Sequence, residues 1–305
     1  MGGAATYFSA AARLYDEVNL VAVVGTDFGQ EHIDFFRERG VSLAGLQIAE
    51  GRTFRWSGRY GYDMNTAETL DTQLNVFATF HPELPEEYMD SEYIFLANID
   101  PALQLDVLSQ IRRPRLTVLD TMNYWINYDK ETLSRAISAV DIVLINEAEA
   151  RQYANTFSLI RAARKILDQG PKALVVKKGE YGAVMFANGD EPKRSYFVAP
   201  AYPLEKIKDP TGAGDSFAGG FIGYLASRDC APQIQLGSAV MEEIRRAIIH
   251  GSVVASYTVE DFGVERLRTL TIDDVLRRYR EFTNFTNFEP TCPWLDSCEH
   301  LNRKG

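Results

Sequence analysis

Cysteine and histidine are scarce in this chain. It contains three cysteines, Cys230, Cys292 and Cys298, and four scattered histidines. An odd number of cysteines without metal-ligand spacing argues against a disulfide framework and a thiolate metal site, and favours reduced thiols in a cytoplasmic protein. A bound metal is therefore expected to have oxygen ligands.

Long apolar runs and excess positive charge are also missing. No run approaches the roughly 20 apolar residues of a membrane span, and residues 1–12 lack the basic start of a secretory signal. The net charge is −10 at pH 7. A negatively charged chain does not attract nucleic acid or an anionic membrane, so neither is expected as a partner.

Two common nucleotide-binding motifs do not fit. The chain has no G-x-x-x-x-G-K-[ST] string, which a P-loop requires. Gly212 and Gly214 are followed by Phe217 where a dinucleotide fingerprint needs glycine or alanine, and they lie late in the chain. A P-loop NTPase and a dinucleotide-dependent dehydrogenase are therefore both weak fits.

The chain does contain short apolar runs that alternate with helical patterns. Strands are expected at 20–24, 93–97, 116–120, 142–146 and 173–177. Their nearly continuous apolar character is typical of parallel strands buried on both faces. Helices are expected at 28–39, 102–111, 130–139, 147–154, 158–169, 215–228, 238–257 and 273–282. This order predicts a doubly wound α/β fold, with a mainly parallel sheet flanked by helices.

Residues 53–63 break this pattern because they alternate with period two. One face holds Phe54, Trp56, Tyr60 and Tyr62, and the other holds Arg55, Arg59 and Asp63. Such alternation predicts a half-exposed antiparallel strand, with 72–80 as its neighbour. It is either an edge hairpin of the main sheet or part of a small β-sheet lid at about 46–80. The aromatic face of a lid needs a cover, which makes it a candidate homodimer surface.

The segment 209–221 reads DPTGAGDSFAGGF and places a glycine-rich loop at the start of a helix. Amides at a helix N-terminus are unpaired and lie at the positive end of the macrodipole, so this loop is a ready anion site. Asp215 would repel a resting phosphate, and it fits better as a proton acceptor beside a phosphoryl group in transit. The alternative is an ordinary tight loop with Asp215 as a helix cap.

This segment resembles the hallmark of the ribokinase-like sugar kinases, the PfkB family. The resemblance implies that Gly212, Ala213 and Gly214 form an anion hole for the transferred phosphoryl group. It implies that Asp215 is the general base that deprotonates a substrate hydroxyl. A ribokinase-like fold, ATP, Mg²⁺ and a monovalent cation such as K⁺ are expected on the same basis.

Other segments resemble the same family in the same order. Residues 24–29, VGTDFG, are similar to its early V-G-x-D-x-x-G segment, although a strand end and turn explain them equally well. The NEAE sequence at 146–149 is similar to its N-x-x-E motif, which implies that Asn146 and Glu149 organise Mg²⁺, partly through water. The alternative is a helix cap with an acidic first turn.

The nucleotide contacts are assigned by the same resemblance. Residues 177–182, KKGEYG, look like the family's T-x-G-x-x-G nucleotide loop, with Lys177 in place of the usual threonine. The alternative is a plain hairpin turn. Residues 250–263 are similar to the late helix and loop that border the adenine, although their small residues could simply let helices pack. The expected nucleotide-binding residues are Lys177, Gly179, Gly182, Thr211, Ser252, Ala255 and Gly263.

The motif that the resemblance links to substrate binding lies at the start of this sequence. The segment 2–7 looks like a G-G-x-x-x-N motif with Tyr7 in place of the asparagine, which suggests a bulkier or different pocket. The family's opening strand and its substrate-binding aspartate are not in this sequence. A missing central strand would leave two neighbouring strands unpaired. The expected substrate contacts are Gly2, Gly3, Tyr7, Asp209 and Asn123.

The leading hypothesis is an ATP-dependent kinase that phosphorylates a hydroxyl of a sugar or nucleoside. Its kinase domain is expected at 1–283, with the lid inserted, and a poorly ordered tail at 284–305. The alternative is a catalytically impaired family member that binds a nucleotide or metabolite.

Overall fold

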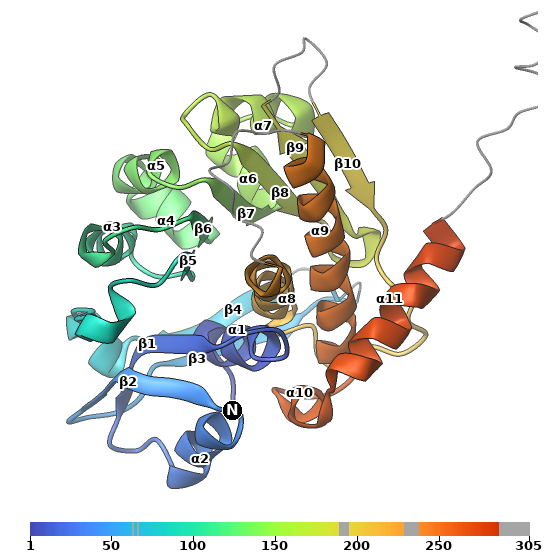
Figure 1. Ribbon diagram of the computed structural model, residues 1–305. Coiled ribbons are helices and arrows are strands. Elements are labelled where there is room, and N and C mark those ends of the chain that lie inside the picture. The colour runs from blue at the N-terminus through green and yellow to red at the C-terminus, as the bar shows by residue number, and fades with distance from the viewer. Residues whose placement is uncertain (63, 66, 189–194, 229–237, 287–305) are drawn as a thin grey trace, which may run out of the picture.

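The largest sheet is built from the apolar runs of the sequence. A computed structural model describes the chain except residues 63, 66, 189–194, 229–237 and 287–305 (Figure 1). The sheet order is β10-β9-β8-β7-β6-β5, and β5 to β8 are parallel to one another. Its strands are β5 Tyr93–Leu96, β6 Leu116–Asp120, β7 Ile142–Asn146, β8 Ala173–Lys177, β9 Ala183–Ala187 and β10 Ser195–Ala199. The expected α/β class is confirmed, and three of the expected strands have the predicted bounds.

Helices cover both faces of this sheet, which explains why its central strands are apolar throughout. Val118, Val143 and Leu144 are fully buried. The helices over one face are α3 Pro101–Gln110, α5 Lys130–Ser138, α6 Glu147–Ala154 and α7 Leu159–Leu167. The other face packs on α8 Ala213–Ser227 and α9 Ser238–Thr258 (Figure 1). The two hydrophobic cores therefore lie on opposite sides of the same strands.

Helix α1 Ala4–Ala12 packs closely against α8, and a glycine allows this approach. A Cβ at Gly219 would lie 2.6 Å from both the Ala11 Cβ and the Phe8 carbonyl oxygen. Real side chains do not pack at such distances, so a larger residue at 219 would push the helices apart. The close packing holds the N-terminal segment beside the helix that begins at the glycine loop.

A second sheet is separate from the first. Strands β1 Val18–Gly25 and β2 Val41–Ala49 form a parallel pair, with α2 Gln30–Glu38 between them in sequence. β1 lies between β2 and β5 in Figure 1, but it belongs to a different sheet from β5. A cavity runs along residues 17–24 and 91–97, and the Asn19 side chain donates to Ser91 Oγ at 3.2 Å near its end. Within the described residues, no strand lies between β1 and β5, which agrees with the expected gap.

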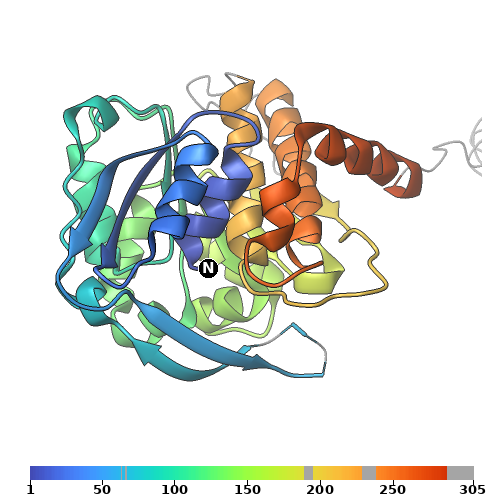
Figure 2. The same ribbon diagram turned by 90° about the horizontal axis from the view of Figure 1, so that it is seen from below.

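The lid is a third, separate sheet of two antiparallel strands, β3 Arg55–Tyr60 and β4 Ala67–Gln73. It is not an edge of the main sheet, and it extends as a long hairpin in Figure 2. Residues of β3 alternate between exposed and half-buried, as expected. The expected partner strand at 72–80 was wrong. The chain turns back sooner, pairing Tyr60 with Ala67, and Asn75–Thr79 forms a 3-10 helix.

Three short or terminal helices complete the described chain, and none was fully expected. They are α4 Asn123–Tyr128, α10 Glu265–Thr269 and α11 Ile272–Thr286. Helix α11 continues past 283, where the tail was expected to begin, and most of that tail lies outside the described residues. No helix in the described part of the chain is long and apolar enough to cross a bilayer.

The separation of β1 from β5 predicts a pattern of amide exchange. Alternate amides of β1 bond to β2, while the others point toward the cavity edge. We expect the cavity-facing amides of β1 to exchange faster than the amides of β7, which has hydrogen-bonded neighbours on both sides. Hydrogen exchange followed by NMR would measure this, with the β2-facing amides of β1 as the internal control. Equal protection of both sets would contradict it.

Candidate active site

Functional side chains gather where β6, β7 and β8 end. Asp120, Asn146 and Lys177 are the last residues of these strands, and Asn146 pairs with Lys177 across the sheet. Parallel strands bring their carboxyl ends to one edge, which is the usual ligand-binding edge of open α/β sheets. Together with the start of α8 they line a cavity of about 2630 Å³.

The glycine loop takes a backbone shape that only glycine accepts comfortably. Gly212 caps α8 with φ of 79°, in the left-handed region. A Cβ there would also lie 2.3 Å from the ring of Tyr7. Just before it, Asp209 Oδ1 accepts the Thr211 amide at 2.9 Å. The loop therefore rests on the Tyr7 ring, and residues 212–214 line the cavity at the start of a fifteen-residue helix.

Asp215 lies in the first turn of α8 and lines the cavity. Burial, followed by the nearby charge of Asp120, raises the pKa of its carboxyl to about 7, and the charge of Lys177 opposes this rise. A carboxylate with a pKa near the operating pH is well matched to accepting a proton. The N-cap of α8 is Gly212, and no side chain accepts a capping hydrogen bond there. The geometry therefore suits proton transfer better than capping.

Lys177 is the buried cation of this edge. Its Nζ lies 2.7 Å from Asp120 Oδ2, and the two side chains are only 16% and 7% exposed. Burial opposes its charge, but Asp120 and then Glu149 outweigh that effect and raise the pKa of Lys177. A Cβ added to Gly214 would lie 3.1 Å from this ammonium. The ammonium thus stands directly beside the glycine loop.

Asn146 and Glu149 form a capping box at the start of α6. The Asn146 side chain accepts the Glu149 amide at 2.8 Å, and Glu149 Oε2 accepts the Asn146 amide at 3.0 Å. Burial, followed by the charge of Asp120, raises the pKa of Glu149 to about 7. The capping alternative is therefore present in the structure. It uses one oxygen of the carboxylate and leaves Oε1 outside the box.

The residues after Lys177 form a tight turn between β8 and β9. The Lys178 amide donates to the Gly182 carbonyl at 2.7 Å, and Gly179 and Gly182 have φ of 56° and 87°. The hairpin alternative therefore describes the backbone, and the nucleotide role stays a prediction. The lid reaches this turn, because Asn65 Nδ2 donates to Glu180 Oε1 at 2.9 Å.

Most of the expected site residues line the same cavity. They are Gly2, Gly3, Tyr7, Asn123, Asn146, Glu149, Lys177, Gly179, Gly182, Thr211, Gly212, Ala213, Gly214, Asp215, Ser252 and Ala255. Asp209 and Gly263 do not line it. Asp209 instead shapes the turn before the glycine loop, and a Cβ at Gly263 would lie 2.7 Å from the Met1 carbonyl oxygen.

Tyr7 and Tyr60 close the cavity beside the glycine loop. Tyr7 is 2% exposed, and burial together with Asp209 raises the pKa of its phenol. Tyr60 comes from the lid, and its hydroxyl accepts from Thr211 Oγ1 at 3.2 Å. The lid therefore contacts the turn that leads into α8.

The sequence was compared with the profiles of known protein families. The sequence profile of the pfkB family carbohydrate kinases matches residues 1–269. The chain belongs to the pfkB family. The expected enzyme class, a sugar or nucleoside kinase, is thereby confirmed, while the roles of individual residues stay predictions.

Nucleoside kinases are prominent among the relatives of this pfkB-family chain. A cytidine kinase from Thermococcus kodakarensis is 32% identical over 80% of the chain and 86% of its own length. A nucleoside kinase from Methanothermobacter thermautotrophicus is 24% identical over 95% and 86%. The solved nucleoside kinase of Methanocaldococcus jannaschii superposes with a TM-score of 0.70 at 23% identity, covering 92% and 86% of the two chains. That likeness confirms the ribokinase-like fold.

Sequence reasoning missed the partner of Lys177 in this kinase. The partner is Asp120, and nothing in the sequence pairs this residue with a lysine 57 residues later. The available signal was that both residues end parallel strands of one sheet, on either side of β7. Tyr60 was placed correctly on the covered lid face, although its contact with Thr211 was not foreseen.

The Asp120–Lys177 pair predicts a strongly coupled double-mutant cycle. Removing one partner of a buried pair leaves the other uncompensated, so Asp120→Asn and Lys177→Met should each lower the free energy of unfolding by about 3–5 kcal/mol. The double variant should lose less than the sum of the two. Urea unfolding measures all three. Lys178→Met is the matched control. The Lys178 side chain is more exposed than that of Lys177, and its Nζ lies 3.8 Å from Glu147 Oε2, which makes a weaker ion pair. Additive losses would contradict the pairing.

Proposed function

We propose that this chain is an ATP-dependent nucleoside kinase, with cytidine as the first acceptor to test. The observation that carries the proposal is Asp215, a half-buried carboxylate one residue beyond the 212–214 loop at the start of α8. Membership of the pfkB family and the 32% identity to a cytidine kinase support the reaction and the acceptor class. The aromatic residues Tyr7 and Tyr60 in the cavity suit a substrate with a flat ring.

The chain's own residues can perform each part of phosphoryl transfer. Asp215 takes the proton of the acceptor hydroxyl, and the amides of 212–214 hold the phosphoryl oxygens at the positive end of α8. The Lys177 ammonium, held by Asp120, adds a positive charge at the loop. The lid contact between Tyr60 and Thr211 limits water access beside the loop.

The residues at the end of β7 fit a magnesium ion held mainly through water. Glu149 is a buried carboxylate with Oε1 outside its capping box, and Asn146 adjoins it. Mg²⁺ commonly uses one or two carboxylates together with substrate phosphates and waters. No group of three acids, histidines or cysteines that could hold a metal ion occurs among the described residues. The ion would neutralise charge on the phosphates of ATP. K⁺ stays an untested expectation.

A panel of acceptors tests the proposed reaction. Cytidine, other nucleosides, ribose and 2-keto-3-deoxygluconate would be incubated with ATP–Mg²⁺, and ADP release would be measured. Phosphorylation of a nucleoside at the highest kcat/KM supports the proposal, whereas preference for a free sugar overturns the acceptor class. Binding of ATP–Mg²⁺ in a thermal shift without turnover of any acceptor would favour the impaired-kinase alternative, for which Tyr7 in place of asparagine is the motivating residue.

Asp215→Asn tests the general base. Asparagine keeps the shape of the side chain but cannot accept the proton, so kcat should fall at least about 100-fold. ATP affinity should be kept, because the 212–214 amides remain. Steady-state kinetics and isothermal titration calorimetry measure the two quantities. Undiminished turnover would exclude Asp215 as the base.

The raised pKa of Asp215 predicts a pH profile. The base works only when ionised, so kcat/KM should fall about tenfold per pH unit below the pKa of about 7 and level off above it. Desolvation raises this pKa, so the acidic limb lies well above the ordinary range of a carboxyl group. Rates measured between about pH 5.5 and 8.5 check it. A flat profile across that interval would contradict an Asp215 base with this pKa.

A further inference from the structure

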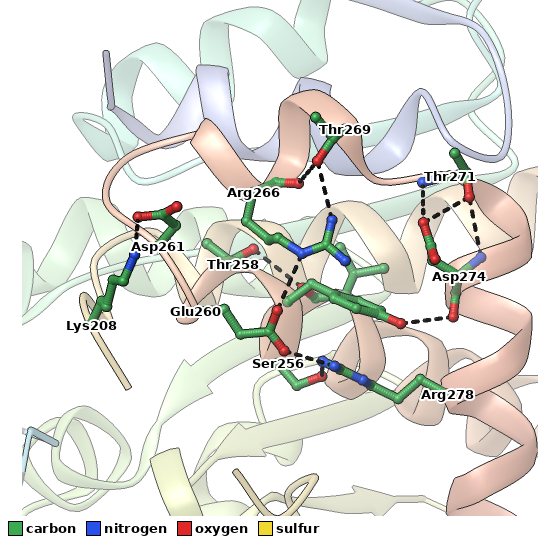
Figure 3. A network of polar contacts seen from close by, with 12 residues as sticks. Lys208, Ser256, Thr258, Glu260, Asp261, Arg266, Thr269, Thr271, Asp274 and Arg278 are labelled. Atoms are coloured by element: carbon green, nitrogen blue, oxygen red, sulfur yellow. Dashed lines mark hydrogen bonds and ion pairs between the residues drawn. The ribbon is translucent and has the colours of Figure 1, made fainter. Parts of the chain in front are cut away.

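A cluster of polar side chains at the border of the cavity ties α11 to the end of α9 and to the loop that follows it (Figure 3). Arg278 of α11 donates from Nη1 to Ser256 Oγ at 2.9 Å and from Nη2 to Glu260 Oε1 at 2.7 Å. Arg266 of α10 donates to the other Glu260 oxygen at 3.2 Å. Glu260 is therefore held from two helices at once.

Burial and ring contacts restrict how this cluster can move. The Arg278 side chain is 12% exposed, and its guanidinium carbon lies 3.5 Å from the centre of the Tyr257 ring. The Arg266 guanidinium carbon lies 4.7 Å from the centre of the same ring. Tyr257 is 2% exposed and donates to the Asp274 carbonyl at 2.9 Å. A planar guanidinium held by two hydrogen bonds and a ring has little freedom left.

The loop held by this cluster in turn holds the backbone that leads into the glycine loop. The Val259 carbonyl accepts the Lys208 and Asp209 amides at 2.9 and 3.4 Å. The Lys208 ammonium reaches Asp261 at 2.9 Å, which adds a second link between the two segments (Figure 3). Asp209 then accepts the Thr211 amide, one residue before the loop. A continuous path of contacts therefore leads from Arg278 to residue 212.

We propose that Arg278 is a positioning residue for the 212–214 loop, acting through Glu260 and the Val259 carbonyl. Arg278 does not line the cavity, so its effect is on the position of other groups. Electrostatic stabilisation of a transferring group depends on donors that are already in place, and small displacements are costly. The proposal rests on the proposed kinase reaction for its catalytic consequence, but its structural consequence can be measured separately.

Arg278→Met tests the proposal with two readouts. Hydrogen exchange should become faster at the Lys208, Asp209 and Thr211 amides and stay unchanged in the 142–146 strand. With a nucleoside acceptor, kcat should fall about 10- to 100-fold while the acceptor KM stays near its original value. Arg280→Met is the matched control, because it removes an equal charge from an exposed position of the same helix. It should change neither readout.

Two milder variants keep the test decisive if Arg278→Met does not fold. Arg278→Lys keeps the charge but cannot bond Ser256 and Glu260 with a planar fork, so both readouts should lie between wild type and Arg278→Met. Lys208→Met changes a side chain that is 56% exposed, and it should speed exchange at 208–211 without lowering the melting temperature much. A graded response across these variants supports a positioning role, since loss of overall stability alone would speed exchange everywhere.

The outcomes separate this proposal from the proposed function. Unchanged exchange at 208–211 in a folded Arg278→Met variant overturns the positioning role, whether or not kcat falls. Faster exchange at 208–211 with unchanged kcat overturns the catalytic consequence. A wild-type protein that phosphorylates no acceptor overturns the proposed kinase reaction, while the exchange measurement still decides whether Arg278 fixes the loop.

Discussion

The charge balance at the carboxyl edge of the sheet is the constraint on which the site depends. Burial, followed by the charge of Asp120, raises the pKa of both Glu149 and Asp215. Without a nearby cation, burial and like-charge repulsion would raise the pKa of Glu149 and of Asp215 further. Lys177 supplies that cation from within the chain, and Asp120 keeps it in place. A base that can be ionised near neutral pH is a consequence of this arrangement.

The need for a positive charge beside these carboxylates explains why Lys177 can stand where the resembling family motif has threonine. A threonine offers a hydroxyl, whereas Lys177 reaches beyond the turn to the glycine loop, where Gly214 leaves room for its ammonium. The turn itself needs only Gly179 and Gly182 to bend the backbone. The position before the turn is therefore free to carry a charge into the site, and this chain uses it to offset the acids.

Much of the fold was predictable, because the central strands are buried on both faces and so carry a continuous apolar signal. The strands at 116–120, 142–146 and 173–177 follow directly from that signal. The lid was predictable as an alternating strand, but not its partner. Hairpin pairing depends on where the chain turns, and the partner was expected at 72–80 whereas the structure has it at Ala67–Gln73. The site was predictable where one segment carries it, as in 209–221. It was not predictable where tertiary packing joins distant residues, as in Asp120 with Lys177.

The position of the glycine loop follows from contacts on three sides. Tyr7 lies beneath Gly212, the lid reaches Thr211 through Tyr60, and the Val259 carbonyl holds the backbone at 208–209. Each support comes from a different part of the chain: α1, the lid and the loop after α9. A loop whose own residues are small cannot fix itself, because glycine has the largest conformational freedom to lose. The flexibility that lets backbone amides approach a phosphate therefore requires rigid neighbours, and Arg278 contributes to one of them from outside the cavity.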